Sequence, residues 1–90
     1  MAQSSTTSAT QDWTEITDAN ITRITIQNQG LVPLEVKATT GATPTDSDGA
    51  IVIPENGILI NEYLADLFPG VAGADRVFIR GSGNVFFSHA

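Results

Sequence analysis

Cysteine is absent from this 90-residue sequence. Neither a disulfide framework nor a thiolate metal site can therefore brace the fold. Ninety residues allow one domain, with a core near the small end of what folds alone. A domain of this size without such braces often gains stability by associating with copies of itself or with a larger partner.

Positive charge is also scarce, with four Lys and Arg against ten Asp and Glu and a net charge of −6. Binding to nucleic acid needs clustered cations, and only Arg76 and Arg80 lie near each other in the sequence. No apolar run approaches the roughly 20 residues of a membrane span. The start, MAQSSTTSATQD, has neither the basic end nor the apolar run of a signal peptide. We therefore expect no nucleic-acid partner, no membrane partner, and synthesis in a cytoplasm.

Charged residues of either sign make up only 16% of the chain, whereas about 25% is typical of soluble domains. Thr, Ser, Asn and Gln supply the polarity instead. Uncharged polar groups cost less to desolvate than ions, so this composition suits a surface that is committed to contacts.

Residues suited to catalysis are few. His89 is the only histidine, and its place near the C-terminus favours an exposed side chain. The serines lie in turns or tails without a plausible base, so we predict a protein that is not an enzyme and has no cofactor. The stretch 46–49, DSDG, resembles the start of a calcium loop but lacks the third ligand position and the spaced Glu. It predicts a solvated turn, and no metal site is expected. An enzyme would require a pocket that gathers acids around His89.

The N-terminal residues 1–11 form a low-complexity segment of Ser, Thr, Ala and Gln. Such a segment buries too little apolar area to offset its ordering entropy, which predicts a flexible N-terminal arm followed by a single β domain at 12–90. An arm that orders against a neighbouring subunit is the alternative. Trp13 follows directly, either to pin the first strand to the core or to anchor the arm at an interface.

Alternating apolar and polar residues predict strands at 21–28 and 31–39, with Val32, Leu34, Val36 and Ala38 pointing inward in the second. The turn signal Asn28-Gln29-Gly30 between them predicts a β-hairpin. Residues 50–53, AIVI, predict a short strand covered on both faces. Residues 57–60 predict another strand, which leads into a helix at about 61–68 with Asn61 as its N-cap. We expect this helix to lie against the sheet and to close an open end of the sandwich or barrel.

A second hairpin is predicted at the end of the chain, from residues 76–80 and 85–88 across the turn at 81–84. The fold class that follows is all-β: a small antiparallel β-sandwich or barrel of about six or seven strands with one short helix. If Val77, Ile79 and one Phe of the final strand fill the core, then Phe78 and the other Phe face outward beside the arginines.

Two interpretations of the outward aromatic residues stay open. Either the short helix or the N-terminal strand covers them, or they form an apolar patch with an arginine rim, which is how a contact surface is built. On the second interpretation, the candidate protein–protein contacts are Trp13, Arg76, Phe78, Arg80 and Phe86.

The succession of NITRITIQNQG (20–30), VPLEV (32–36), IVIPENG (51–57), LFPGVAGADRVFIR (67–80) and VFFSHA (85–90) resembles small structural proteins of tailed bacteriophages, of the capsid decoration (cement) type. The resemblance implies a small β-sandwich or barrel on the virion, at the capsid surface. It would bind the outer surface of the assembled head through the major capsid protein and stabilise contacts between capsomers. It would act as a homo-oligomer, with a trimer favoured. The alternative is a virion spike or fibre, or a head–tail component, with a role in recognising host glycan.

Overall fold

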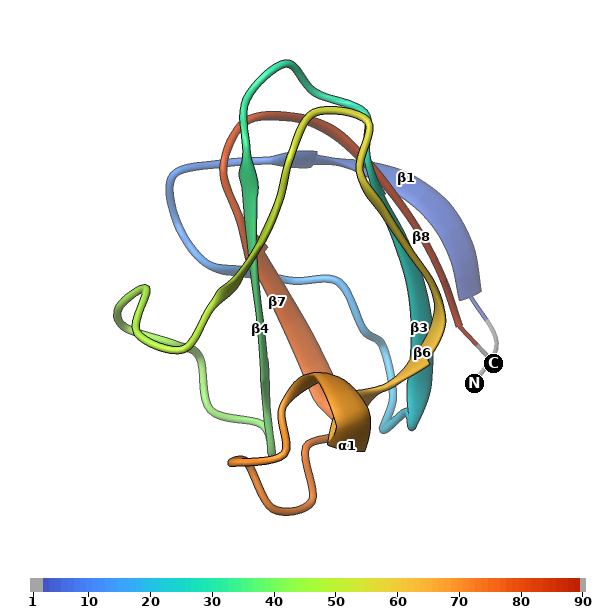
Figure 1. Ribbon diagram of the computed structural model, residues 1–90, viewed down its shortest axis with the longest axis vertical. Coiled ribbons are helices and arrows are strands. Elements are labelled where there is room, and N and C mark those ends of the chain that lie inside the picture. Colours follow the sequence, from blue (N-terminus) through green and yellow to red (C-terminus); the bar gives the residue numbers. More distant parts are fainter. Residues whose placement is uncertain (1–2, 90) are drawn as a thin grey trace.

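The computed structural model describes residues 3–89, which form a sandwich of two four-stranded antiparallel sheets (Figure 1). Sheet A has the strand order β1-β8-β3-β6, and sheet B has the order β2-β7-β4-β5. The fold class predicted from the sequence, a small all-β sandwich with one short helix, is confirmed. The elements are β1 (Gln3–Ala9), β2 (Thr14–Glu15), β3 (Arg23–Asn28), β4 (Leu34–Thr39), β5 (Ile51–Ile53), β6 (Ile58–Tyr63), α1 (Leu64–Leu67), β7 (Arg76–Arg80) and β8 (Gly83–His89).

The core lies between the inner faces of the two sheets. Val77 and Ile79 of β7 are fully buried, as their alternation with the arginines predicted. Val85 and Phe87 of β8 are buried opposite them, so Phe87 is the aromatic residue of the final strand that fills the core. Because the buried positions alternate along these strands, each sheet presents one apolar face to the core and one face outward.

Both predicted hairpins are wrong, although their strands are present. β3 pairs with β6 and β8 in sheet A, whereas β4 pairs with β5 and β7 in sheet B. Likewise β7 belongs to sheet B and β8 to sheet A. Each turn therefore crosses from one sheet to the other instead of joining neighbours within a sheet.

Asn28 explains the first crossing. Its side chain is fully buried, its Nδ2 donates to the carbonyl oxygens of Val32 (2.8 Å) and Ile53 (3.0 Å), and its Oδ1 accepts the Gly30 N–H (2.9 Å). These bonds stabilise a bend between the two sheets where the turn of a hairpin was expected. Val32 lies in this bend, outside β4, with 44% of its surface exposed, so its predicted inward position is wrong.

The predicted helix at 61–68 is shorter than expected. β6 continues to Tyr63, and α1 is a single turn from Leu64 to Leu67 with Tyr63 in the N-cap position. Asn61 is no cap, because it lies within β6 with a φ of 50° and its N–H is bonded to the Thr25 side chain (2.9 Å). Leu64 and Phe68 are nonetheless buried, and α1 closes one end of the sandwich as predicted (Figure 1).

The N-terminal segment differs most from its prediction. Gln3–Ala9, within the segment assigned to a flexible arm, forms β1 and pairs with β8 along its whole length. The physical reason is that pairing with β8 satisfies the backbone hydrogen bonds of β1, although the side chains of β1 bury little apolar area. Met1 and Ala2 of the predicted arm lie outside the described residues.

The segment 51–53, predicted to be covered on both faces, is an edge strand of sheet B. Val52 in β5 is 58% exposed, while Ile53 is buried. Within residues 3–89, no helix has the length and apolar character needed to cross a membrane.

Candidate functional site

Trp13 and two cations form a cluster on the outer face of sheet B. Trp13 directly precedes β2, and pairing of Thr14 with Ile79 brings the indole beside Arg80 of β7. The Arg80 guanidinium carbon lies 4.6 Å from the centre of the ring, and the Lys37 Nζ lies 6.0 Å from it. Both cations are within reach of the negative face of the indole, with Arg80 the closer. We call Trp13, Lys37 and Arg80 the tryptophan cluster.

Acidic partners fix both cations of the tryptophan cluster. Arg80 Nη2 lies 3.3 Å from Glu35 Oε2 and also donates to the Ser47 hydroxyl, while Lys37 Nζ lies 3.2 Å from Asp46 Oδ1. These bonds tie the loop at 40–50 to sheet B. A hydrogen bond from Ser47 lowers the pKa of Glu35, with Arg80 and Lys37 acting in the same direction against burial. A hydrogen bond from Lys37, together with the Asp48 N–H, lowers the pKa of Asp46.

The hydrogen-bonding capacity of the Trp13 indole is not satisfied by these contacts. Trp13 is half-buried, and its Nε1–H is enclosed without an acceptor among the described residues. Buried tryptophan N–H groups usually find a partner. This feature keeps open the interpretation that Trp13 anchors an interface.

Arg76 lies on the same face and is engaged by neighbours of its own. Its Nη1 donates to Glu15 Oε2 (2.9 Å), and its Nε donates to Asn20 Oδ1 (2.9 Å). Glu15 Oε2 also accepts a hydrogen bond from Thr17 (2.8 Å). Arg76 thus closes the segment at 15–20 onto β7.

Phe78 points to the outer face of sheet B but is only 3% exposed. It lies on the central strand β7 and is paired with Glu15 on one side and Lys37 on the other, so neighbouring strands flank it on both sides. Of the two interpretations left open, the structure therefore agrees with the one in which Phe78 is covered, and Phe78 offers no exposed contact beside the arginines. Phe78 is thus a packed residue on the face that carries the tryptophan cluster, beside Lys37 of that cluster.

Phe86 belongs to a different surface. It is half-buried on the outer face of sheet A, between Thr6 of β1 and Gln27 of β3. The five candidate contacts therefore divide, with Trp13, Arg76, Phe78 and Arg80 on sheet B and Phe86 on sheet A.

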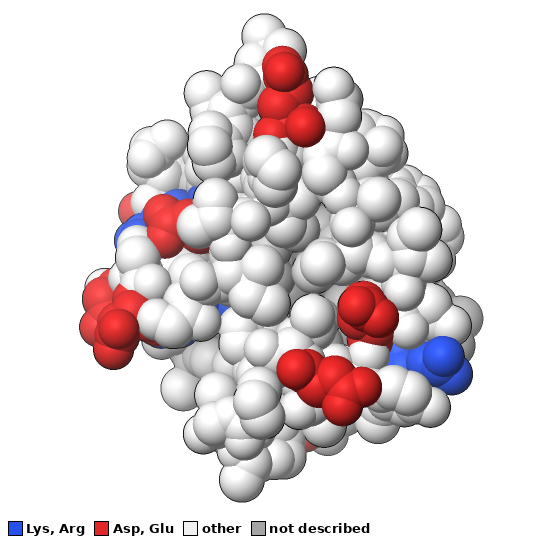
Figure 2. All heavy atoms as spheres, viewed as in Figure 1, with Lys and Arg blue, Asp and Glu red and all other residues white. Residues whose placement is uncertain are grey.

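Exposed apolar side chains on β5 and β6 were missed in the sequence. Val52 is 58% exposed, Ile58 is 46% exposed and Ile60 is 67% exposed. β6 is an edge strand of sheet A and β5 is an edge strand of sheet B, and we call the two together the β5–β6 edge. Pairing with Glu35 turns Val52 to the outer face of sheet B, whereas pairing with Gln27 turns Ile58 to the outer face of sheet A. Figure 2 shows acidic groups at the top, at the left and in the lower centre of this face, with a broad uncharged area between them. Runs of Ile and Val without polar alternation gave no signal of exposure, because they are typical of covered strands.

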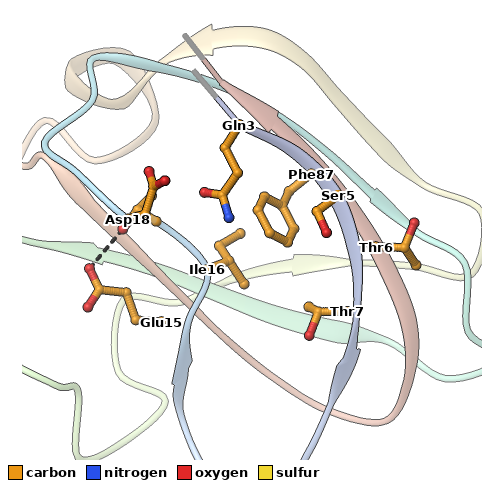
Figure 3. Close-up of a pocket in the computed structure, with 9 residues that line it drawn as sticks. Gln3, Ser5, Thr6, Thr7, Glu15, Ile16, Asp18 and Phe87 are labelled. Atoms are coloured by element: carbon orange, nitrogen blue, oxygen red, sulfur yellow. Dashed lines mark hydrogen bonds between the residues drawn. The ribbon is translucent and has the colours of Figure 1, made fainter. Parts of the chain in front are cut away.

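A hollow of about 380 Å³ opens at the opposite side of the sandwich, between β1 and the segment at 15–18 (Figure 3). Its lining combines the apolar Ile16 and Phe87 with polar groups of β1 and with Asp18. We call it the β1 hollow. It exists because β1 belongs to sheet A while the chain after β2 follows sheet B, where the Ile16 N–H bonds to Val77 (3.0 Å).

His89 lies near this hollow and is buried, so its predicted exposure is wrong. Pairing of β1 with β8 encloses it opposite Gln3, whose Oε1 lies 2.8 Å from His89 Nε2. Asp18 Oδ1 lies 3.7 Å from the same nitrogen, and Nδ1 is enclosed without a partner. In a catalytic triad the nucleophile and the carboxylate contact different nitrogens of the imidazole ring. Here Gln3 and Asp18 both lie against Nε2 of His89, so the geometry is not that of a triad.

Three carboxylates elsewhere on the described chain, those of Glu15, Glu35 and Asp46, form ion pairs with Arg or Lys. Among residues 3–89, no three or more His, Cys, Asp or Glu side chains gather to hold a metal ion. In the turn at 46–49, Asp46 Oδ1 accepts from Lys37 and from the Asp48 N–H (3.1 Å). Its side chain thus fixes the turn and the cluster beside it.

Comparison with protein families, with curated proteins and with solved structures finds no match to this chain.

Proposed function

We propose that this chain is a non-enzymatic structural protein that decorates a bacteriophage head. It would bind the major capsid protein on the outer surface of the assembled shell, as a homo-oligomer, and stabilise the contacts between capsomers. The observation that carries this proposal is the exposure of Val52, Ile58 and Ile60 at the β5–β6 edge. These side chains offer apolar contacts on the outer faces of both sheets at their β5 and β6 edges, and such contacts suit binding to other protein.

The composition supports an external position on the particle. A net charge of −6 disfavours adhesion to packaged DNA, and the exposed side chains of Val52, Ile58 and Ile60 carry no charge that would have to be desolvated. When many copies bind around a closed shell, their individually weak contacts together give strong binding to the shell. The phage assignment itself rests on the resemblance of the strand and turn pattern.

The alternative role in binding host glycan would be favoured by Trp13 and Tyr63 on one surface. Trp13 lies on sheet B with Arg80, whereas Tyr63 ends β6 in sheet A, where Arg23 lies 4.4 Å above its ring. The two aromatic rings therefore belong to different sheets, and this geometry does not favour a shared sugar platform. We expect no binding on a glycan array.

Heating of phage particles tests the proposal. We expect particles that lack the protein to release DNA at a lower temperature than wild-type particles, and purified protein to restore their tolerance. The double variant Val52→Asp and Ile60→Asp should fail to restore it, because two charges would have to be desolvated at the contact. Thr43→Asp, at an exposed loop position, is the matched control and should restore tolerance fully.

Two results would contradict the proposal. One is an unchanged release temperature in particles without the protein. The other is a copy number of six or twelve per particle, because those values belong to the portal axis, whereas a decorated shell carries hundreds of copies.

A further inference from the structure

The four edge strands of the sandwich differ in how well they are protected against pairing with another chain. β2 has two residues and β5 has three, so neither offers a long template. β6 is interrupted, because its register with β3 shifts between Ile24 and Ile26 and Asn61 has a φ of 50°. Short strands and bulges are the devices that prevent edge-to-edge association.

β1 has none of these protections. Its seven residues, QSSTTSA, pair with β8 in unbroken register from Gln3 to Ala9 and include no charge, proline or glycine. β8 is the only strand with which β1 pairs among the described residues, so the far side of β1 presents free backbone N–H and C=O groups. An edge of this kind is a template for strand addition.

The β1 hollow lies at the same edge. Ser5 pairs with Phe87 and shares its inward direction, yet Ser5 is exposed because no strand covers it from the far side. Figure 3 shows Ser5 and Thr7 on the side of the hollow and Thr6 directed away from it. A strand added beside β1 would extend sheet A over the hollow and cover these hydroxyl groups.

A second copy of the same strand suits this edge, because the uncharged Ser and Thr side chains of β1 would meet one another in an antiparallel pairing. In an antiparallel pairing centred on Thr6, Ser4 lies opposite Ser8, Ser5 lies opposite Thr7, and Thr6 lies opposite Thr6 of the second copy. Each pair joins two even-numbered or two odd-numbered residues, so inward-facing residues of one copy lie beside inward-facing residues of the other on the same side of the sheet. Pairs of Ser and Thr across strands are favourable, and no charge meets its like along the strand.

We propose that two copies of this chain join through β1 in this two-fold antiparallel pairing, so that sheet A continues from one copy into the other. The contact is isologous, which gives a dimer, whereas the resemblance to phage decoration proteins implied a trimer. It lies at β1, on the side of the sandwich away from the β5–β6 edge, and leaves that edge free for a larger partner. The proposal concerns the isolated chain and does not depend on the proposed function.

Disulfide trapping tests the pairing directly, because the natural chain has no cysteine. Residues opposite each other in antiparallel strands have Cα atoms about 4.5–5.5 Å apart, within the range of about 4.4–6.8 Å that a disulfide spans. We expect Thr6→Cys to form a covalent dimer under mild oxidation. Ile60→Cys, at an exposed position on the opposite edge strand, should remain monomeric in denaturing electrophoresis. Equal cross-linking of both variants would overturn the proposal.

Sedimentation equilibrium of the full chain gives the second measurement. We expect a mass of twice 9.5 kDa for the natural chain, and a dissociation constant raised roughly tenfold or more by Thr6→Lys, since two ammonium groups would meet at the axis. Ile60→Lys should leave the dissociation constant unchanged, and circular dichroism should show both variants folded. A monomer at every concentration, or a trimer insensitive to Thr6→Lys, would overturn the proposal. If the chain were a monomer that binds capsid protein through β1, a strand of the capsid protein would pair with β1 in place of a second copy, and the proposal would also be overturned.

Discussion

The outer faces of the two sheets are built from different side chains. On sheet B, Arg76, Arg80 and Lys37 each lie within 3.3 Å of a carboxylate oxygen, and a loop is tied down over the face. On sheet A, the outward positions of β1, β8 and β3 are hydroxyl, amide and aromatic groups, with a single cation at the end of β3. These outward residues are Ser4, Thr6, Ser8, Asn84, Phe86, Ser88, Thr25, Gln27 and Arg23.

This difference indicates how the two faces can be used. A charged face whose ion pairs are already complete gains little from a new partner, because those ions would have to lose water again. The outer face of sheet A has a single cation and so has little of this desolvation cost. Sheet A and the edge strands are therefore the better surfaces for association, whereas sheet B mainly holds its own loop and Trp13 in place.

The largest expected contrast between the faces concerns their phenylalanines. Phe78→Ala should lower the free energy of unfolding by about 3–5 kcal/mol, because Phe78 is 3% exposed and its removal leaves a cavity. Phe86→Ala should cost about 1–2 kcal/mol, since the half-buried ring loses less apolar contact. Urea unfolding measures both. Equal losses would show that the outer face of sheet B is not packed as described.

Acid should weaken the ion pairs of sheet B. The pKa of Glu35 and the pKa of Asp46 are both lowered in the folded chain from ordinary values of 4.5 and 3.8. The unfolded chain therefore binds protons at a higher pH than the folded chain does. The stabilisation from these groups is fully present above those ordinary values and is lost as the pH falls through the lower folded values.

Thermal unfolding between pH 2 and pH 6 checks this sign. The double variant Glu35→Gln and Asp46→Asn should lose less stability on acidification than the natural chain, because the two lowered carboxyl groups are gone. Thr25→Ser, on the outer face of sheet A, is the matched control and should follow the natural chain. A double variant with an unchanged pH dependence would contradict the assignment of these ion pairs.

Alternation predicted which residues of β3, β4 and β7 face the core, because burial on one side of a strand leaves a period of two in the sequence. For β8 it left open which of the two phenylalanines faces inward, and Phe87 does. It could not predict which strands pair. Asn28-Gln29-Gly30 has the composition of a tight turn, yet the bonds from the Asn28 side chain to Val32 and Ile53 convert it into a crossing between sheets. Ile53 is 25 residues away, and no local pattern encodes that contact.

The same limit applies to the candidate contacts. The sequence named Trp13, Arg76 and Arg80 as candidate contacts but did not predict that β2 and β7 bring them onto one face. The burial of Phe78 depends on β2 and β4 lying on both sides of β7, and sequence alone does not give that order. Gln3–Ala9 became a strand because β8 offers a partner, although its composition is typical of a disordered tail.

The smallest expected effect separates the two cation–aromatic pairs. Arg80→Ala should uncover Trp13 and raise its quenching by acrylamide, at a cost in stability of about 1 kcal/mol or less. Arg23→Ala should leave the quenching unchanged, because Arg23 lies over Tyr63 in the other sheet. Trp13 is the only tryptophan, so its fluorescence reports on sheet B alone. If Arg23→Ala changed the quenching as much as Arg80→Ala, the two faces would be coupled, and the separate roles inferred for them would fail.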